Sequence, residues 1–394
     1  MPKTLAPILP AGRFPMELKP DAFWATRTET RARSVSATSL LPMVLVVLAL
    51  GLLTACGHRA DVMKPVAVAA AGTSRVDLVV ATTRMASPDP AVLFTGERGN
   101  YVSINNVVVS IPPEANRKTG EIAWPGNARS DPLKSFVTVK AAGMSESQAF
   151  DWFKRRSGPK RRALIFVHGF NTSYAEAVFR FAQISHDIRV DAAPVLFTWP
   201  SRNNVLDYVY DRESTIYSRF GLVQVLDEAI KSGDVDDITI LSHSMGTWLT
   251  MEALREIAIR DRKLSPKITN VVLASPDIDI DVFRRQLVEM GKKRPAFTVI
   301  TSRNDLALAM SKWIAGDVDR VGGGNLEREK DLLASDGVSV IDASDYKQSD
   351  PLGHNAFAQS SDMLKALAKR ISSQPLGSRA LSPLGERLLA RTGS

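Results

Sequence analysis

The stretch DITILSHSMGTWL, residues 237–249, decides how this chain folds. Asp237–Leu241 is a short apolar run typical of a buried strand, and the residues from Gly246 onward have the pattern of a helix. Between them, Ser242-His243-Ser244-Met245-Gly246 has the form of a tight strand-to-helix turn that lifts a nucleophilic serine above a sheet. Ser242 stands where glycine is usual, but it is also small, as close packing at such a turn requires. The context predicts Ser244 as a nucleophile, and the N-terminus of the helix favours developing negative charge beside it.

Apolar strands and helical patterns alternate on both sides of this turn. Strands are expected at Val76–Ala81, Asn106–Ile111, Ser135–Ala141, Ala163–Val167, Pro194–Trp199, Asp237–Leu241, Asn270–Ala274, Ala296–Thr301 and Val338–Ile341. Helical patterns include Tyr174–Ile188 and Gly246–Arg260, and Ser145 with Gln148 predicts a capping box that opens a helix through Arg155. Continuous apolar strands that alternate with helices predict a mostly parallel sheet with helices on both faces.

A nucleophilic serine needs a base, and the chain has five histidines. His58 lies in an expected linker, His186 on an expected helix and His243 inside the turn, while His168 belongs to another motif. His354 follows the last expected strand, so it comes after Ser244 and after the candidate acids, an order known for this type of turn. His354 is therefore the candidate base.

Two aspartates at strand ends are candidates for the acid that orients this histidine. Asp305 follows the strand Ala296–Thr301, and Asp277 follows the strand before it. Fold analogy favours the later strand, so Asp305 is the first candidate and Asp277 remains the alternative. The series Asp277, Asp279 and Asp281 is interpreted as a polar turn with a helix cap rather than a metal loop.

The negative charge that develops on the substrate oxygen in the transition state also needs hydrogen-bond donors. Ile165–Val167 is a strand that ends in His168-Gly169, and Gly169 allows close backbone approach. Such a loop supplies one amide of an oxyanion hole, and the residue after the nucleophile supplies the other. We assign these N–H groups to Phe170 and Met245.

Several segments together resemble one family: HGFNTSYAEA (168–177), TWPSRNNVLDYVYDREST (198–215), LSHSMGTWL (241–249), VVLASPDIDIDVF (271–283) and SRNDLAL (302–308). It is an uncharacterised bacterial α/β-hydrolase family, esterase/lipase-like and once labelled a domain of unknown function, and the resemblance runs from about Val76 to about Lys369. It implies an α/β-hydrolase fold with Ser244, Asp305 and His354 at the triad positions. Possible pocket residues are His168, Tyr208, Tyr210, Asp211 and Arg212, and the alternative for the segment 199–212 is packing within a lid or helix.

The N-terminal part has the features of an export signal. Leu40–Ala55 (LLPMVLVVLALGLLTA) is uncharged and follows Arg31 and Arg33. Leu53–Gly57 resembles the lipobox of bacterial lipoproteins, in which the cysteine, here Cys56, is acylated. A single-pass anchor is the alternative, but a membrane-spanning helix needs about 20 residues. We expect a leader and signal peptide at 1–55, a lipid-anchored tether at 56–75, the hydrolase domain at 76–370 and a tail at 371–394.

Composition narrows the remaining classes of function. Cys56 is the single cysteine of the chain, which excludes an intramolecular disulfide and a multi-cysteine metal site, and a net charge of +8 is too mild to indicate nucleic-acid binding. We find no phosphate-cradling loop, dinucleotide fingerprint or metal-ligand constellation, so we expect neither a cofactor nor a metal.

The sequence thus predicts a serine hydrolase of small-molecule or lipid carboxylic esters, held at the cell envelope by its lipid anchor. Two alternatives remain: a non-catalytic envelope lipoprotein that uses the fold as a binding module, and a peptidase, thioesterase or acyltransferase with the same triad.

Overall fold

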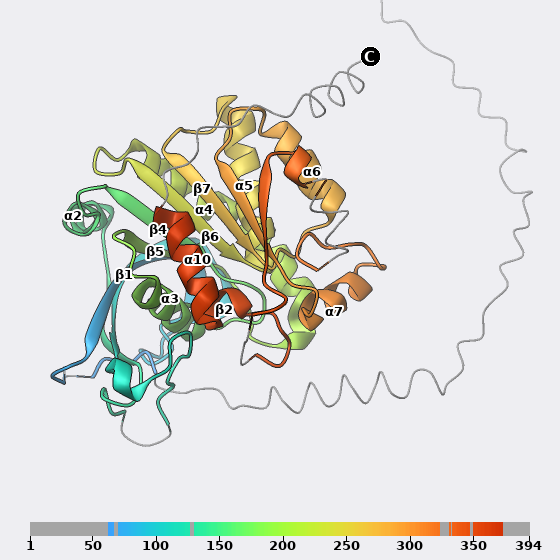
Figure 1. Ribbon diagram of the computed structural model, residues 1–394. Helices are drawn as coiled ribbons and strands as arrows, with labels where there is room; N and C mark the ends of the chain where they lie inside the picture. Colours follow the sequence, from blue (N-terminus) through green and yellow to red (C-terminus); the bar gives the residue numbers. More distant parts are fainter. Residues whose placement is uncertain are drawn as a thin grey trace, which may run out of the picture. The chain divides into compact units, whose positions relative to one another are not determined.

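A single sheet of nine strands organises the described part of the chain in the computed structural model (Figure 1). Its strands, in spatial order, are β3 (Val137–Gly143), β2 (Phe94–Ile111), β1 (Ser74–Ala86), β5 (Ala193–Thr198), β4 (Arg162–Val167), β6 (Asp237–His243), β7 (Ile268–Ala274), β8 (Ala296–Thr301) and β9 (Val338–Asp342). The strands from β1 to β9 in this order pair in parallel, whereas β2 and β3 add an antiparallel edge. The predicted, mostly parallel sheet is confirmed.

The structure describes residues 62–66, 70–126, 130–323, 331, 333–346 and 350–372. All of them belong to one unit of the chain, His58–Ser394. The predicted signal peptide, Cys56 and the chain after Ser372 lie outside these residues. None of the helices within the described ranges combines the length and the hydropathy needed to cross a membrane.

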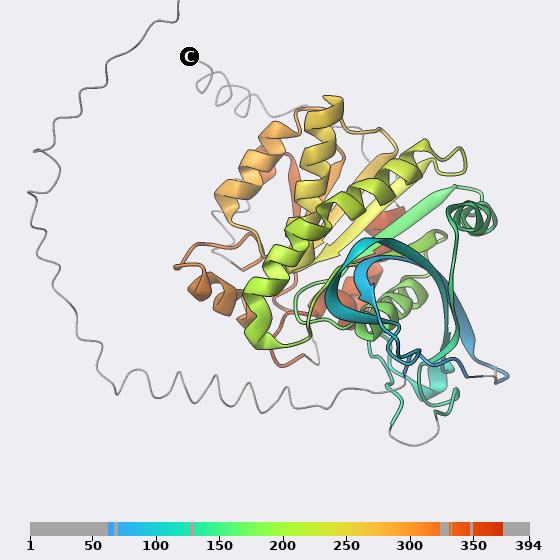
Figure 2. The ribbon, with the colours of Figure 1, turned by 180° about the vertical axis from the view of Figure 1, so that it is seen from behind.

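Helices cover both faces of the sheet, as predicted. They are α2 (Glu146–Arg156), α3 (Tyr174–Ile188), α4 (Tyr208–Lys231), α5 (Met245–Asp261), α6 (Ile280–Glu289), α7 (Leu306–Ile314), α9 (Ala356–Gln359) and α10 (Ser361–Ser372), with short 3₁₀ turns η1 (Glu114–Asn116) and η2 (Val205–Asp207). Helices α3 and α10 lie in front of the sheet in Figure 1 and share one buried apolar cluster with it. Helices α4 and α5 lie on the opposite face, seen in Figure 2, and build the second cluster with α2 and α6.

Local sequence signals explain where several helices begin. The predicted capping box at α2 is present, because the Ser145 side chain accepts from the Gln148 N–H and the Gln148 side chain accepts from the Ser145 N–H. Ser173 and Glu176 form a second capping box that opens α3, which places this helix directly after the His168–Thr172 loop. Asp279 caps α6, as the polar turn predicted.

The packed domain begins earlier than the predicted boundary at residue 76. Val62 and Met63, assigned to the tether, are buried in the cluster around α3 and α10. The Val66 N–H also donates to the Thr138 carbonyl of β3 at 2.9 Å. Two isolated apolar residues have no periodicity to mark them as core, but burying them removes their apolar surface from water.

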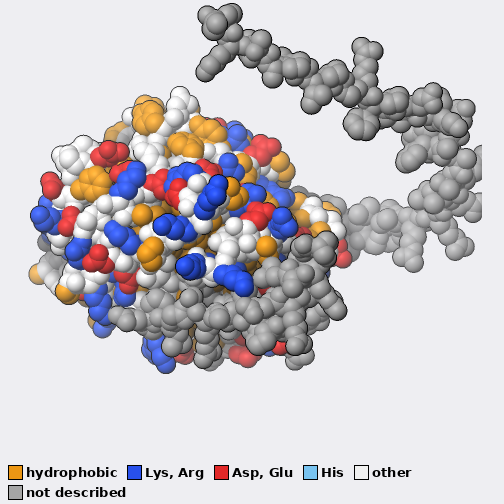
Figure 3. Space-filling view, turned by 90° about the horizontal axis from the view of Figure 1, so that it is seen from above, with side chains coloured by type: hydrophobic (Ala, Val, Ile, Leu, Met, Phe, Trp, Pro, Cys, Tyr) orange, Lys and Arg blue, Asp and Glu red, His pale blue; other side chains and the backbone are white. Residues whose placement is uncertain are grey.

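Surface charge is mixed. Figure 3 shows Lys and Arg side chains spread among carboxylates over the face that is uppermost in Figure 1. Exposed ion pairs include Arg161 with Asp236 at 3.3 Å and Arg260 with Asp227 at 2.7 Å. Pairs of this kind contribute little to stability individually.

Candidate functional site

Ser244 occupies the turn between β6 and α5 with a strained backbone. Its φ of 52° and ψ of −125° lie in a region that L-amino acids seldom adopt. Hydrogen bonds hold it there: the Ser244 N–H donates to the Ala274 carbonyl at 2.9 Å, and the Thr247 N–H donates to the Ser244 carbonyl at 3.0 Å. The residue is 5% exposed. The sequence prediction of a tight strand-to-helix turn at Ser244 therefore matches the backbone of the structure.

Two glycines let this turn press against the end of β4. A Cβ atom on Gly246 would lie 2.1 Å from the His168 carbonyl oxygen, and one on Gly169 would lie 2.8 Å from the Cβ of Ser244. Both distances are far below van der Waals contact, so a side chain at either position forces backbone movement. The close approach places the loop after β4 directly beside Ser244.

His354 and Asp305 meet at the same edge of the sheet. The His354 Nδ1 atom lies 2.7 Å from Asp305 Oδ2, while Asp305 Oδ1 accepts from the Leu308 N–H at 2.9 Å and so caps α7. The carboxylate is therefore fixed by the helix that it starts. The His354 ring packs on the His243 ring, 4.6 Å between centroids, and its carbonyl contacts His243 Nε2 at 3.2 Å. His354 thereby lies against the residue that precedes Ser244.

The charge environment of His354 favours its protonated form. Burial lowers its pKa, but the hydrogen bond and the charge of Asp305, helped by Asp277 and Asp350, outweigh burial and raise the pKa above 6.5. Asp350 also accepts the His354 N–H at 2.9 Å, which fixes the loop. Among the described residues there is no hydrogen bond between the Ser244 hydroxyl and His354. Contacts of this kind are often long in a ligand-free hydrolase and close when substrate binds.

Asp277, the alternative acid, has other partners. Its carboxylate accepts from the Tyr208 hydroxyl at 3.0 Å and from the Ser311 hydroxyl at 2.5 Å, and it pairs with Arg320 at 3.3 Å. These contacts join the start of α4 to α7. The geometry therefore favours Asp305 over Asp277 as the partner of His354.

His168, considered as a pocket residue, is instead enclosed beneath the loop that it begins. The side chain is 2% exposed and stacks on Trp199 with 4.9 Å between ring centroids. The Trp199 N–H donates to His168 Nε2 at 3.1 Å, so the ring proton is on Nδ1, which donates to the Gly169 carbonyl at 2.8 Å. Burial, followed by the charge of Arg84, lowers the pKa of His168 well below 6.5. His168 is a neutral support of the loop.

Two backbone N–H groups next to Ser244 have no protein acceptor. Within the described chain neither the Phe170 N–H nor the Met245 N–H donates a hydrogen bond. Phe170 follows Gly169, which touches Ser244, and Met245 is the first residue of α5. These are the two donors expected from the sequence, and their position suits an anion formed at a group bound to Ser244.

Three other pocket candidates, Tyr208, Tyr210 and Arg212, have different surroundings. Tyr208 lies beside the site, because its ring meets the ring of Phe170 edge-on at 5.2 Å. The Tyr210 hydroxyl instead contacts Glu97, and the Arg98 and Arg202 guanidinium groups lie over the Tyr210 ring. Arg212 is exposed on α4, with its guanidinium 5.3 Å from the Trp248 ring centre. Tyr210 and Arg212 thus contact neighbouring side chains, as the packing alternative describes.

Two buried charges lie behind the loop: Arg84 at the end of β1, which sequence reasoning missed, and Asp211 in the first turn of α4, which it named only as a possible pocket residue. Arg84 is 2% exposed and Asp211 is fully buried. Asp211 lies in the segment that the family resemblance singled out, which is the one signal that pointed to it. No motif surrounds Arg84, and its burial depends on strand pairing far away in the chain.

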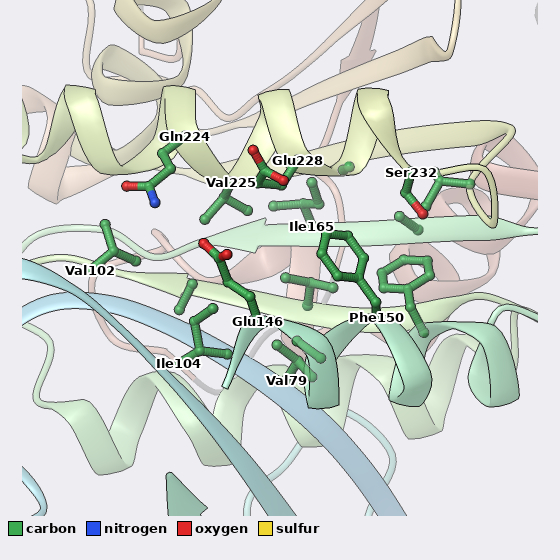
Figure 4. A pocket seen from close by; sticks show the side chains of 17 residues that line it. Val79, Val102, Ile104, Glu146, Phe150, Ile165, Gln224, Val225, Glu228 and Ser232 are labelled. Atoms are coloured by element: carbon green, nitrogen blue, oxygen red, sulfur yellow. The ribbon is translucent and has the colours of Figure 1, made fainter. Parts of the chain in front are cut away.

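An apolar pocket lies on the face of the sheet between α2 and α4 (Figure 4). Figure 4 shows Phe150 and Glu146 rising from α2 toward Val225 and Glu228 of α4, with Ile165 of β4 between them. None of the residues that line this pocket is Ser244, Asp305, His354, Phe170 or Met245. The pocket therefore lies apart from the Ser244 site.

A curated protein of a Nostoc strain resembles part of this chain. Over 155 residues the chain is 26% identical to the uncharacterized protein alr1448 of Nostoc sp. (strain PCC 7120 / SAG 25.82 / UTEX 2576), a match that covers 32% of this chain and 40% of that protein. The chain thus spans about two fifths of the length of that curated relative.

Two solved structures are similar at 12% identity. An esterase of Pyrobaculum calidifontis has a TM-score of 0.35, with 68% of this chain and 81% of that chain covered. The S-formylglutathione hydrolase FrmB of Staphylococcus aureus has a TM-score of 0.34, with 78% and 100% covered.

A family model described as "Alpha/beta hydrolase of unknown function (DUF900)" matches residues 145–370, which is more than half of the chain. The matched region contains the strands β4 to β9, the Ser244 turn, Asp305 and His354. Together with the parallel sheet it confirms the predicted α/β-hydrolase fold and supports hydrolase activity in the broad sense. The chain belongs to this α/β-hydrolase family.

Proposed function

We propose that the chain is a serine hydrolase that cleaves carboxylic esters through an acyl-enzyme at Ser244. One observation carries the proposal: a strained serine at a strand-to-helix turn shares one edge of the sheet with a histidine whose Nδ1 lies 2.7 Å from a helix-capping aspartate. This set supplies a nucleophile, a base and an orienting acid in the order expected for the fold.

In the first step His354 acts as a general base. Asp305 accepts the Nδ1–H of His354, which leaves Nε2 unprotonated and able to take the Ser244 hydroxyl proton. The Ser244 oxygen attacks the ester carbonyl, and the carbonyl oxygen becomes an oxyanion. The Phe170 and Met245 N–H groups donate to this oxyanion, each contributing about 3 kcal/mol to the transition state.

Collapse of the tetrahedral intermediate breaks the bond to the leaving alcohol. The alkoxide takes the proton from His354 Nε2 and departs, and Ser244 keeps the acyl group as an ester. Water then attacks this ester while His354 accepts its proton. A second collapse releases the carboxylic acid and returns the proton to Ser244.

We further propose that the enzyme works at the cell envelope. The lipobox-like sequence at Leu53–Gly57 and the uncharged run before it support acylation of Cys56 and a lipid anchor. The measurement is metabolic labelling with an alkyne-tagged fatty acid. Label on the wild type and no label on Cys56→Ser supports the anchor, and equal label on both proteins contradicts it.

The activity is tested with the full chain and its Ser244→Ala variant. Hydrolysis of p-nitrophenyl esters of graded acyl length is expected for the wild type and absent for the variant, and a fluorophosphonate probe should label the wild type alone. Parallel amide and thioester substrates distinguish an esterase from a peptidase or thioesterase. A wild type that neither turns over any substrate nor reacts with the probe contradicts the enzyme proposal and favours a binding module.

A further inference from the structure

All five N–H groups of Arg84 donate to acceptors in or behind the loop that contains Phe170. A guanidinium has five N–H donors. The five contacts of Arg84 are Thr198 Oγ1 at 2.9 Å, the Thr95 carbonyl at 3.2 Å, the Ser201 carbonyl at 3.0 Å, His168 Nε2 at 3.3 Å and the Thr172 carbonyl at 2.7 Å. Two of these acceptors, His168 and Thr172, belong to the loop that contains Phe170.

This arginine is a buried charge, and among the residues that the structure describes no carboxylate forms an ion pair with it. Burial lowers its pKa to about 10, and the charge of Asp211 is the largest influence in the opposite direction. Arg84 is therefore still a cation at neutral pH. Because all five of its N–H groups are used by acceptors in and around the loop, this cation ties the loop to the ends of β1 and β5.

Asp211 supports the same loop from the other side. Its carboxylate accepts from the Asn171 N–H at 3.3 Å, the Arg202 N–H at 3.0 Å and the Ser201 hydroxyl at 2.5 Å. Ser201 in turn accepts the Thr172 N–H at 3.0 Å. Asp211 thereby holds the two amides that follow Phe170.

These contacts surround Phe170 without engaging its N–H. Before it, the Gly169 carbonyl contacts His168 Nδ1 at 2.8 Å; after it, Asn171 and Thr172 are held by Asp211, Ser201 and Arg84. Asn171 has a φ of 54°, an uncommon conformation that such a framework stabilises. The Phe170 N–H is therefore kept in one direction while it remains available to a ligand.

We propose that Arg84 and Asp211 are positioning residues that fix the Phe170 N–H as an oxyanion donor beside Ser244. The proposal rests on the proposed function, because it assigns both charges a part in the same hydrolytic site. Neither residue touches the substrate. Both act through the backbone of the loop 168–173.

The test compares Arg84→Met and Asp211→Asn with the wild type, all as full chains. An oxyanion donor acts in the transition state, so kcat should fall about 10- to 100-fold in each variant while KM changes less than about threefold. Inhibition by a trifluoromethyl ketone, whose adduct with serine carries an oxyanion, should weaken by the same factor as kcat/KM.

Two further variants separate this role from general support of the fold. Arg98→Met is the control, because Arg98 is a second arginine that ties a strand to another element, here β2 to α4 through Ser214 and the Tyr210 carbonyl, and has no contact with the loop in the described part of the chain. It should keep wild-type kcat. Arg84→Lys retains the charge but not the five-donor fork, and we expect it to recover less than a tenth of the lost kcat.

Amide hydrogen exchange adds a measurement independent of turnover. Exchange in a peptide covering residues 168–173 should rise in Arg84→Met and Asp211→Asn and stay unchanged in Arg98→Met. Wild-type kcat in both variants, or equal losses in Arg98→Met, overturns the positioning role while the Ser244→Ala result leaves the proposed function standing. A wild type without turnover or fluorophosphonate labelling overturns the proposed function and this inference together.

Discussion

Two histidines at the carboxyl edge of the sheet, the buried His168 and the half-buried His354, have opposite surroundings. His354 has the Asp305 carboxylate 2.7 Å from its Nδ1, and its pKa is raised above 6.5. His168 has the Arg84 guanidinium 3.3 Å from its Nε2, and burial together with that charge lowers its pKa well below 6.5. The same side chain is therefore suited to accept a proton in one place and kept neutral in the other. Burial lowers the pKa of both histidines, and the Asp305 carboxylate reverses this effect at His354, whereas the Arg84 guanidinium adds to it at His168.

The largest expected difference between the two regions is in activity. His354→Gln should lower kcat/KM by about 10⁴- to 10⁶-fold, because no other group takes the Ser244 proton. His168→Gln should lower it far less, about 10- to 100-fold, through a displaced loop. Ester hydrolysis by the two purified variants measures this. Comparable losses would show that the two histidines are not functionally distinct.

The acid that serves His354 is tested next. Asp305→Asn should lower kcat about 10³- to 10⁴-fold, since the amide no longer selects the useful tautomer of His354. Asp277→Asn is the matched control at the neighbouring strand end, and we expect a loss below about tenfold from its disturbed contacts with Tyr208 and Ser311. If the Asp277 variant is the more damaged of the two, the assignment of the acid is wrong.

The pH dependence of kcat/KM should report His354 alone. Activity should fall about tenfold per pH unit below the pKa of His354, with a midpoint above pH 6.5 because Asp305 raises that pKa. In the residual activity of Asp305→Asn the midpoint should move to lower pH. Rate profiles from pH 5 to 9 with a neutral substrate provide the measurement, and a midpoint below pH 6 in the wild type would contradict it.

The smallest effect concerns stability in acid. His168 and His243 have folded pKa values well below 6.5, so below about pH 6.5 the unfolded chain binds protons that the folded chain does not. Stability should therefore fall as pH decreases from 6.5, by up to about 1.4 kcal/mol per pH unit for each histidine.

The contribution of His354 to stability changes with pH in the opposite direction. Its raised folded pKa contributes stability that is complete below pH 6.5 and is lost as pH rises through that pKa. Urea unfolding at several pH values tests both signs. In a plot of the free energy of unfolding against pH, His168→Gln should reduce the slope below pH 6.5. His354→Gln should reduce the slope above pH 6.5. An unchanged slope below pH 6.5 in His168→Gln would contradict the lowered pKa of His168 in the folded chain.

Much of the framework was predictable because it depends on local pattern. The strand Ala296–Thr301 and the helix Tyr174–Ile188 have the bounds that the sequence predicted. Helix α4 was not predicted as such, since its apolar residues do not form one stripe; it packs against both the sheet and α5. For the same reason the sequence left open whether Tyr210 and Arg212 line a pocket or pack within a helix: the direction of a side chain on such a helix depends on its neighbours.

The sequence by itself determined the parallel sheet, the turn at Ser244 and the choice of His354, because strand pattern, turn chemistry and a count of five histidines are properties of the chain. Fold analogy ranked Asp305 before Asp277, but only the tertiary structure shows that Asp305 contacts His354 while Asp277 contacts Tyr208 and Ser311. The tertiary structure also decided that His168 is a support and that Arg84 lies beneath the loop. These outcomes depend on distances of about 3 Å between residues far apart in sequence, and charge interactions over such distances set protonation.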